Sequence, residues 1–172
     1  MLYDVRKMDD YPIQVFEHQN VRGLEFCPVD NKLLATGGRD GVKVWNMDNG
    51  DLESTMPIPG KELDQMIATK EVTSLLWSPY NKEVMASYDN YLSIWSLSSS
   101  GKSHHLKEWR ASPSHHESST VISMDHLPNG RVVSLNTMGT YVDWFHIFER
   151  RMHRKDVQIE SSFTDFQIFN KL

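Results

Sequence analysis

Four polar residues early in the chain are of the types that carry out acid–base and nucleophilic chemistry. They are His18, Thr36, Asp40 and Trp45. A histidine, a hydroxyl and a carboxylate could form a hydrolytic triad. The same groups, together with an indole N–H, could instead satisfy one another as a buried hydrogen-bonded network. We interpret them as a structural network and expect no enzymatic activity, because no catalytic constellation appears elsewhere in the sequence.

Other candidate chemistry is weaker. The pairs His104-His105 and His115-His116 could bind a metal, but adjacent strand residues point to opposite sides, and no cysteine or carboxylate cluster lies at ligand spacing. Cys27 has no evident partner base and is expected to be a small buried hydrophobe. The glycine-rich run 37–41 lacks the Lys-Ser/Thr of a phosphate loop and precedes a strand. We therefore expect no catalytic residue, cofactor or metal.

The composition is that of an ordinary globular protein. The 172 residues carry a net charge of -5 at pH 7, which gives no broad electrostatic case for nucleic acid or an anionic membrane. The short basic run within 150–155 is expected to be solvated. The sequence shows no signal peptide and no apolar run long enough to span a bilayer. A single cysteine excludes an internal disulfide and fits the nucleus or the cytoplasm.

A repeat of about fifty residues organises the chain. The first two copies begin with Val-x-x-Leu-x-Phe/Trp, continue through a proline turn and end a β-rich stretch in tryptophan, and a weaker third copy follows. These tryptophans are Trp45, Trp95 and Trp144, which are 50 and 49 residues apart. No long segment sustains a 3.6-residue apolar period, so the short apolar runs predict strands rather than helices.

This pattern resembles the WD repeat, whose period is about 40 to 45 residues. It predicts an all-β fold, a partial WD40 β-propeller of about three four-stranded blades. We expect the fourth strands at 52–55, at 105–109 and after Phe148. The predicted organisation is an N-terminal segment 1–11, three WD blades within 12–150 (about 12–56, 70–110 and 118–150) and a C-terminal tail 151–172.

WD blades are often tied by a tetrad of His, Ser/Thr, Asp and Trp, and the resemblance gives this role to the four polar residues named first. In the second copy we expect Ser87, Asp89 and Trp95 at the corresponding positions, without the histidine. In the third copy we expect Ser134 and Trp144, without a clear aspartate. The tetrad is thus predicted to be complete in the first blade and to lack members in the second and third blades.

Several segments are more specific than the repeat itself. Residues 16–28 contain Phe, His-Gln and Cys-Pro in order, and residues 33–38 read Leu-Leu-Ala-Thr-Gly-Gly. Residues 76–83 read Leu-Trp-Ser-Pro-x-x-Lys-Glu, and residues 90–95 read Asn-x-Leu-x-Ile-Trp. In these blocks the chain resembles the Cdc20/Cdh1 (Fizzy) family of WD-repeat activators of the anaphase-promoting complex. The resemblance covers roughly residues 12–150 and corresponds to the last three blades of that family.

The resemblance implies a binding role in cell-cycle proteolysis, in the nucleus and cytoplasm. The implied partners are subunits of the anaphase-promoting complex ubiquitin ligase and degron-bearing substrates, with no nucleic acid and no membrane. Family members hold the KEN degron with an arginine before the last blade's first strand, and the destruction-box arginine with an acidic residue entering its third strand. Here these positions are Thr120 and Gly139. We expect loss of a charge-assisted contact at each, on the order of 1.5–3 kcal/mol.

A second hypothesis is a generic WD-repeat scaffold without a role in ubiquitination. The sequence lacks the family's C-box arm and Ile-Arg tail. A propeller closes with about four to eight blades, and three blades would leave two exposed edges. We therefore expect a C-terminal fragment of a longer product, a diverged remnant, or a chain that closes by association.

Overall fold

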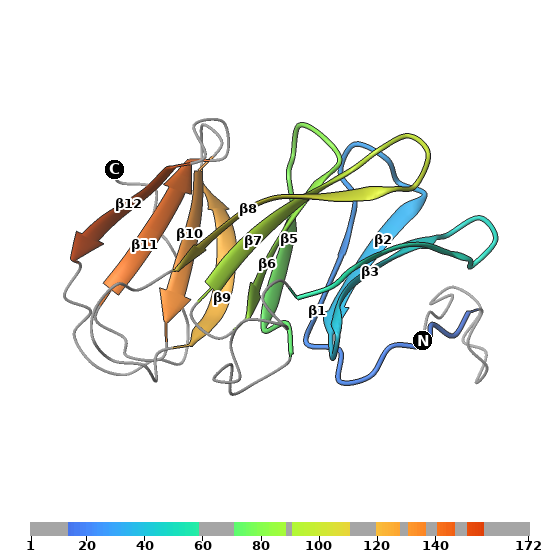
Figure 1. Ribbon diagram of the computed structural model, residues 1–172, viewed down its shortest axis with the longest axis horizontal. Helices are drawn as coiled ribbons and strands as arrows, with labels where there is room; N and C mark the ends of the chain where they lie inside the picture. The colour runs from blue at the N-terminus through green and yellow to red at the C-terminus, as the bar shows by residue number, and fades with distance from the viewer. Residues whose placement is uncertain are drawn as a thin grey trace, which may run out of the picture.

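A computed structural model describes residues 14–58, 71–88, 91–110, 120–127, 131–136, 141–146 and 151–156. Twelve strands lie in this part of the chain, in three four-stranded antiparallel sheets, each in sequential order (Figure 1). No helix long and apolar enough to cross a membrane lies among these residues. The all-β, partial WD40 propeller predicted from the repeat is confirmed.

The strands of each sheet follow one another along the chain. The first sheet comprises β1 (Gly23–Phe26), β2 (Leu33–Gly38), β3 (Gly41–Asn46) and β4 (Leu52–Met56). The second comprises β5 (Ser74–Trp77), β6 (Glu83–Tyr88), β7 (Tyr91–Leu97) and β8 (Ser103–Arg110). The third comprises β9 (Val121–Leu127), β10 (Arg131–Asn136), β11 (Tyr141–His146) and β12 (Arg151–Asp156).

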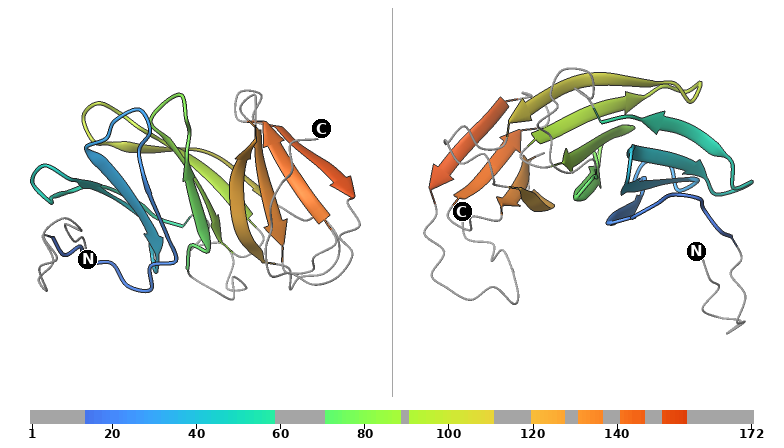
Figure 2. Two further views of the ribbon diagram at one scale, coloured as in Figure 1. Left: turned by 180° about the vertical axis from the view of Figure 1, so that it is seen from behind. Right: turned by 60° about the horizontal axis from the view of Figure 1, so that its bottom comes forward.

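The sheets stand side by side in an arc, as the blades of a propeller do (Figure 2). The first strands β1, β5 and β9 contact one another in succession, and the outer strands β4 and β8 also touch. We call the end of the sheets at which β1, β5 and β9 begin the leading end. The opposite end, where the β1–β2 and β5–β6 turns lie, is the trailing end.

The strand register makes the first two sheets superimposable residue by residue. Trp45 pairs with Leu34 in the first sheet, and Trp95 pairs with Val84 in the second. Residues of β6 and β7 are therefore equivalent to residues 50 positions earlier in β2 and β3. Residues of β5 are equivalent to those 51 positions earlier in β1, because Phe26 pairs with Leu34 and Trp77 with Val84.

The core lies between the sheets. One buried cluster joins the side of the first sheet that bears Ala35, Val42 and Val44 to the side of the second that bears Leu75 and Trp77. A second cluster joins the next pair of sheets through Met85, Leu92, Ile94, Val121, Met124 and Val132. Each sheet thus buries apolar side chains against its neighbour, which is the main source of stability for strands too short to persist alone.

The third sheet extends beyond the boundary predicted from sequence. Its outer strand, β12, pairs with β11 over the full length of both strands, so 151–156 belong to the sheet rather than to a tail starting at 151. The sequence Arg-Met-His-Arg-Lys-Asp lacks the β-branched residues and apolar alternation typical of strands. Backbone pairing at a sheet edge overrides this weak propensity. The predicted segment 1–11, and residues 157–172, lie outside the described residues.

Candidate protein-binding surface

Three of the four polar residues named first in the sequence lie together at the leading end of the first sheet. The Trp45 indole Nε1 donates to Thr36 Oγ1 at 2.8 Å, and His18 Nδ1 lies 2.9 Å from the same hydroxyl. His18 Nε2 lies 2.9 Å from the carbonyl oxygen of Arg39. Because a carbonyl only accepts, Nε2 carries the proton. Neutral His18 therefore accepts from Thr36, and the chain runs from Trp45 through Thr36 and His18 to the backbone.

The protonation state of His18 is tied to this arrangement. Burial lowers the pKa of His18 below its usual 6.5, and the Arg39 carbonyl and the Asp40 charge oppose that shift only in part. Asp40 itself is exposed and has a left-handed φ of 74° in the β2–β3 turn. It acts on His18 through its charge, while the carbonyl of Arg39 receives the Nε2 proton. This network fixes the segment that precedes β1 against β2.

The second sheet does not repeat this network. The residue equivalent to Thr36 is Ala86, whereas Ser87, which the sequence suggested, lies one position further along and on the other side of the sheet. The Ser87 hydroxyl instead lies 2.9 Å from the Thr73 hydroxyl. On the Ala86 side, a separate cluster takes over: the Tyr88 hydroxyl contacts Ser93 Oγ at 2.8 Å, and both donate to the Glu108 carboxylate.

In the third sheet the register also departs from the first. Trp144 pairs with Val133, so Ser134 lies one position beyond the partner of the tryptophan, where Thr36 lies two positions beyond. Ser134 nevertheless pairs with Met124 as Thr36 pairs with Leu24, so Ser134 does occupy the hydroxyl position, and Trp144 lies one position before the register equivalent of Trp45. The expectation is therefore wrong for Ser87, and in the third sheet it is wrong for Trp144. A one-residue offset along a strand places a side chain on the opposite side of the sheet.

The leading end carries a polar cluster that spans the first two sheets. Asn20, Glu71 and Thr120 each precede the valine that opens a repeat, so they are equivalent positions. Asn20 Nδ2 donates to Glu71 Oε1 at 2.7 Å, and Arg22 Nε donates to Glu71 Oε2 at 3.1 Å. These two donors, Asn20 foremost, lower the pKa of Glu71. Glu71 is thus held as a carboxylate, with the largely exposed Arg22 beside it.

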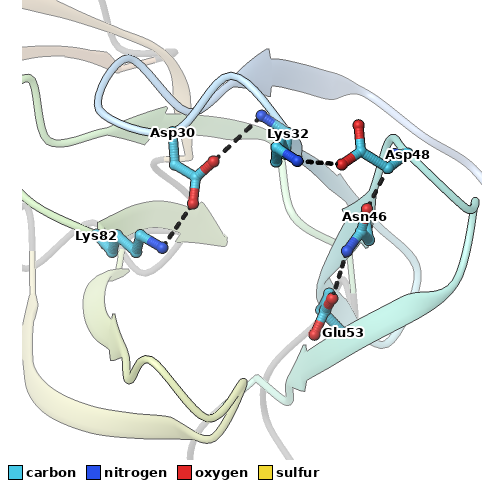
Figure 3. Close-up of polar contacts among 6 residues, drawn as sticks. All are labelled: Asp30, Lys32, Asn46, Asp48, Glu53 and Lys82. Carbon is cyan, nitrogen blue, oxygen red and sulfur yellow. Dashed lines mark hydrogen bonds and ion pairs between the residues drawn. The ribbon is translucent and has the colours of Figure 1, made fainter.

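The trailing end carries a second polar chain (Figure 3). Lys82 Nζ donates to Asp30 Oδ2 at 2.6 Å and thereby links the second sheet to the first. The Lys82 hydrogen bond is also the main reason that the pKa of Asp30 is lowered. Further contacts continue across the first sheet from Asp30 to Lys32, Asp48, Asn46 and Glu53. These contacts join turns to one another, which favours a structural role at this end.

The remaining sequence candidates fall in different places. Thr120 is half-buried and immediately precedes β9, whereas Gly139 lies outside the described residues. Cys27 is buried directly after β1, and burial raises the pKa of its thiol, which keeps it in the weakly nucleophilic form. His104 and His105 are neighbours on β8. In the described ranges no three His, Cys, Asp or Glu side chains gather as a metal site would require.

Sequence reasoning missed the contact between Glu71 and the pair Asn20 and Arg22. These residues are 51 and 49 positions apart, and only the packing of successive blades brings them together. Their spacing is close to the repeat period, which is the one signal in the sequence that could have revealed the contact.

Comparison with known families supports the repeat assignment. The family described as WD domain, G-beta repeat matches residues 10–46 and 60–96. The WD repeat-containing protein slp1 of Schizosaccharomyces pombe is 32% identical over 135 residues, covering 75% of this chain and 24% of slp1. An Arabidopsis thaliana protein, cell division cycle 20.4, cofactor of APC complex, is 32% identical over 120 residues, covering 66% of this chain and 23% of that protein.

A budding-yeast relative and two solved structures are also similar to this chain. The meiosis-specific APC/C activator protein AMA1 of Saccharomyces cerevisiae is 32% identical over 93 residues, covering 51% of this chain and 14% of AMA1. A chain of the mitotic checkpoint complex superposes with a TM-score of 0.50 at 26% identity, over 80% of this chain and 37% of that one. The Cps50 (Swd1) β-propeller domain of Myceliophteria thermophila reaches 0.62 at 17% identity, over 84% and 41%, and so reports on the fold alone.

The chain spans about a quarter of the length of slp1 and of the Arabidopsis relative. Over that span the repeat, the register of the sheets and the sequence identity all indicate WD repeats. The chain belongs to the WD-repeat proteins, and its sequence places it with the Cdc20/Fizzy family.

Proposed function

We propose that this chain is a substrate-binding adaptor module of the anaphase-promoting complex, acting in cell-cycle proteolysis in the nucleus and cytoplasm. The observation that carries the proposal is the 32% identity to slp1 over 75% of the chain, together with relatives named as activators or cofactors of that complex. Its role is to bind partners through the rigid ends of its blades. A propeller end suits this task because loops on a rigid scaffold make preorganised binding surfaces.

The leading end is the favoured binding surface. Glu71 supplies an anionic group that two neighbours hold in place, and Arg22 supplies a largely exposed cation beside it. An extended peptide with a lysine next to an acidic residue, as in a KEN degron, is complementary to this pair. Thr120, at the equivalent position of the third sheet, contributes a hydroxyl instead of a charge. Recognition here therefore depends on the first two sheets.

Binding of fluorescent peptides tests this surface. A KEN-containing peptide should bind the purified chain, and Arg22→Ala should weaken binding by about tenfold, which is the loss of one charge-assisted contact. Lys32→Ala is the matched control, because Lys32 also makes one surface ion pair but lies at the trailing end. Equal binding by the two variants would contradict a leading-end site.

Recovery of the complex tests the partner assignment. The chain, immobilised and exposed to mitotic extract, should retain subunits of the anaphase-promoting complex above an unrelated WD propeller used as the control. Failure of both proteins to retain them would contradict the proposed partner, whatever the peptide result.

The second candidate is a WD-repeat scaffold with no role in ubiquitination. The neutral Thr120 favours it, because the family resemblance assigns a degron-holding arginine to that position. This candidate predicts no binding of the KEN peptide and no retention of the complex, so the same two experiments separate the hypotheses.

A further inference from the structure

Trp77 fills a site between the first and second sheets. It is 0% exposed, and its indole Nε1 donates to the carbonyl oxygen of Glu25 on β1 at 3.0 Å. The buried cluster to which it belongs draws on both sheets. Members of that cluster include Cys27, Leu33, Ala35, Val44 and Val84. A single indole thus completes the contact between these two blades.

The corresponding site between the second and third sheets holds a histidine. Val132 pairs with His126 as Val84 pairs with Trp77, so His126 is the register equivalent of Trp77. His126 lies two residues after Met124 on β9, so both side chains point toward the second sheet. An imidazole is a single small ring, whereas an indole has a second ring fused to it. The third blade therefore presents a smaller ring at this position.

A pocket lies beside His126, between the second and third sheets. It is open to solvent on one side and, together with its mouth, encloses about 220 Å³. Its lining includes Ser78, Glu83, Met85, Ile94 and Val132. In the strand register these are the equivalents of Cys27, Leu33, Ala35, Val44 and Val84, in that order. The pocket is therefore the site that an indole fills one blade earlier, and the smaller ring of His126 fills it only in part.

Polar groups distinguish this pocket from the site that Trp77 fills. Ser78 and Glu83 flank the β5–β6 turn, where the first interface has the buried pair Cys27 and Leu33. The Nδ1 atom of His126 is buried and has no hydrogen-bond partner among the residues that the structure describes. A buried nitrogen without a partner is unfavourable. Apolar walls with a few polar groups are typical of ligand-binding pockets.

We propose that this pocket binds one branched aliphatic side chain, a leucine or an isoleucine, of an extended peptide from a partner protein. The side chain contacts Met85, Ile94 and Val132, and a main-chain N–H of the peptide donates to His126 Nδ1. The Glu83 carboxylate at the mouth favours a lysine or an arginine next to the aliphatic residue.

An aliphatic side chain is the favoured occupant because of the size and the chemistry of the site. The unfilled space corresponds to the second ring of an indole, so a further aromatic side chain does not fit beside the imidazole. A peptide supplies both the apolar group and the N–H donor. Both walls of the pocket belong to the second and third sheets of this chain, so the site needs no other segment. It lies toward the trailing end, and it does not rest on the degron-binding surface proposed for the leading end.

Nuclear magnetic resonance of the purified chain tests the proposal with two small probes. Acetyl-lysyl-leucine methylamide carries the cation, the aliphatic side chain and the main-chain donors, and acetyl-lysyl-glycine methylamide lacks only the aliphatic side chain. The leucine probe should shift the Met85 methyl and His126 ring signals in a saturable way. It should bind about tenfold more tightly than the glycine probe, because it buries an apolar side chain. Equal binding of the two probes, or no saturable shift, would overturn the proposal.

Variants test the location of the site. His126→Trp fills the pocket and should abolish binding of the leucine probe. Val29→Trp is the matched control, because it adds an indole to the exposed β1–β2 turn at the same end and should bind as the wild type does. Glu83→Gln gives a second test that leaves the walls of the pocket intact. It should weaken acetyl-lysyl-leucine methylamide about fivefold and leave acetyl-leucine methylamide unchanged. Unaltered binding by His126→Trp, or an equal effect of Glu83→Gln on both leucine probes, would contradict the assignment.

Discussion

Thr36 is the residue on which the buried network of the first sheet depends. Its hydroxyl accepts from the Trp45 indole and donates to His18, and its side chain is buried. Removing one group therefore leaves two others without a partner, and the resulting penalty exceeds the value of a single hydrogen bond. The arrangement makes Thr36 more important for stability than its small size suggests.

Replacement of Thr36 by valine tests this reasoning. The side chains have similar volume, so the loss reflects the hydroxyl, and we expect Thr36→Val to lower the free energy of unfolding by about 1–3 kcal/mol. Thr55→Val is the control, because Thr55 lies exposed on β4 and its replacement should change stability by no more than about 0.5 kcal/mol. Urea denaturation measures both. Equal effects would show that the network contributes nothing beyond ordinary strand packing.

The same network predicts a dependence of stability on pH. Because burial lowers the pKa of His18 in the folded chain, the unfolded chain binds a proton more readily below pH 6.5. The stabilising contribution of neutral His18 is therefore complete above that pH and is lost as the pH falls toward the folded pKa. Melting temperatures of the wild type and His18→Asn, measured from about pH 8 to about pH 5, should converge as the pH falls. A constant difference would contradict this role.

At the scale of the sheets, Gly37 sets how closely the first two blades approach. A Cβ at this position would lie 2.5 Å from Val72 Cγ1 and 2.9 Å from Leu75 Cδ2, and both side chains are buried. Gly23, its cross-strand partner, has more room: a Cβ there would come no nearer than 3.3 Å to any atom. The two glycines therefore form a natural pair for measuring the tolerance of the interface.

We expect Gly37→Ala to destabilise the chain by about 1–3 kcal/mol, because the overpacked side chains have no free volume to move into. Gly23→Ala should cost clearly less, and Ser74 at the equivalent position of the second sheet indicates that a side chain fits there. Chemical denaturation of the two variants measures both losses of unfolding free energy. An equal loss would mean that conformational entropy, rather than contact between blades, governs both positions.

The elements themselves were largely predictable, whereas their side-chain partnerships were not. Tryptophans about fifty residues apart and prolines after each first strand predicted three four-stranded sheets. The period did not determine which side of a sheet Ser87 faces, because a shift of one residue reverses the side. It placed a fourth strand after Phe148 but could not set the bounds of β12, whose basic sequence forms a strand only because β11 offers a partner. Contacts between blades, such as Glu25 with Trp77, follow from the packing and not from local propensity.

For the whole molecule, stability depends on the second sheet, because it takes part in both buried clusters. Its Leu75 and Trp77 pack against the first sheet, and its Met85 and Ile94 pack against the third. The free energy gained by burying apolar side chains therefore joins the three sheets through the second one, and the first and third sheets both depend on it.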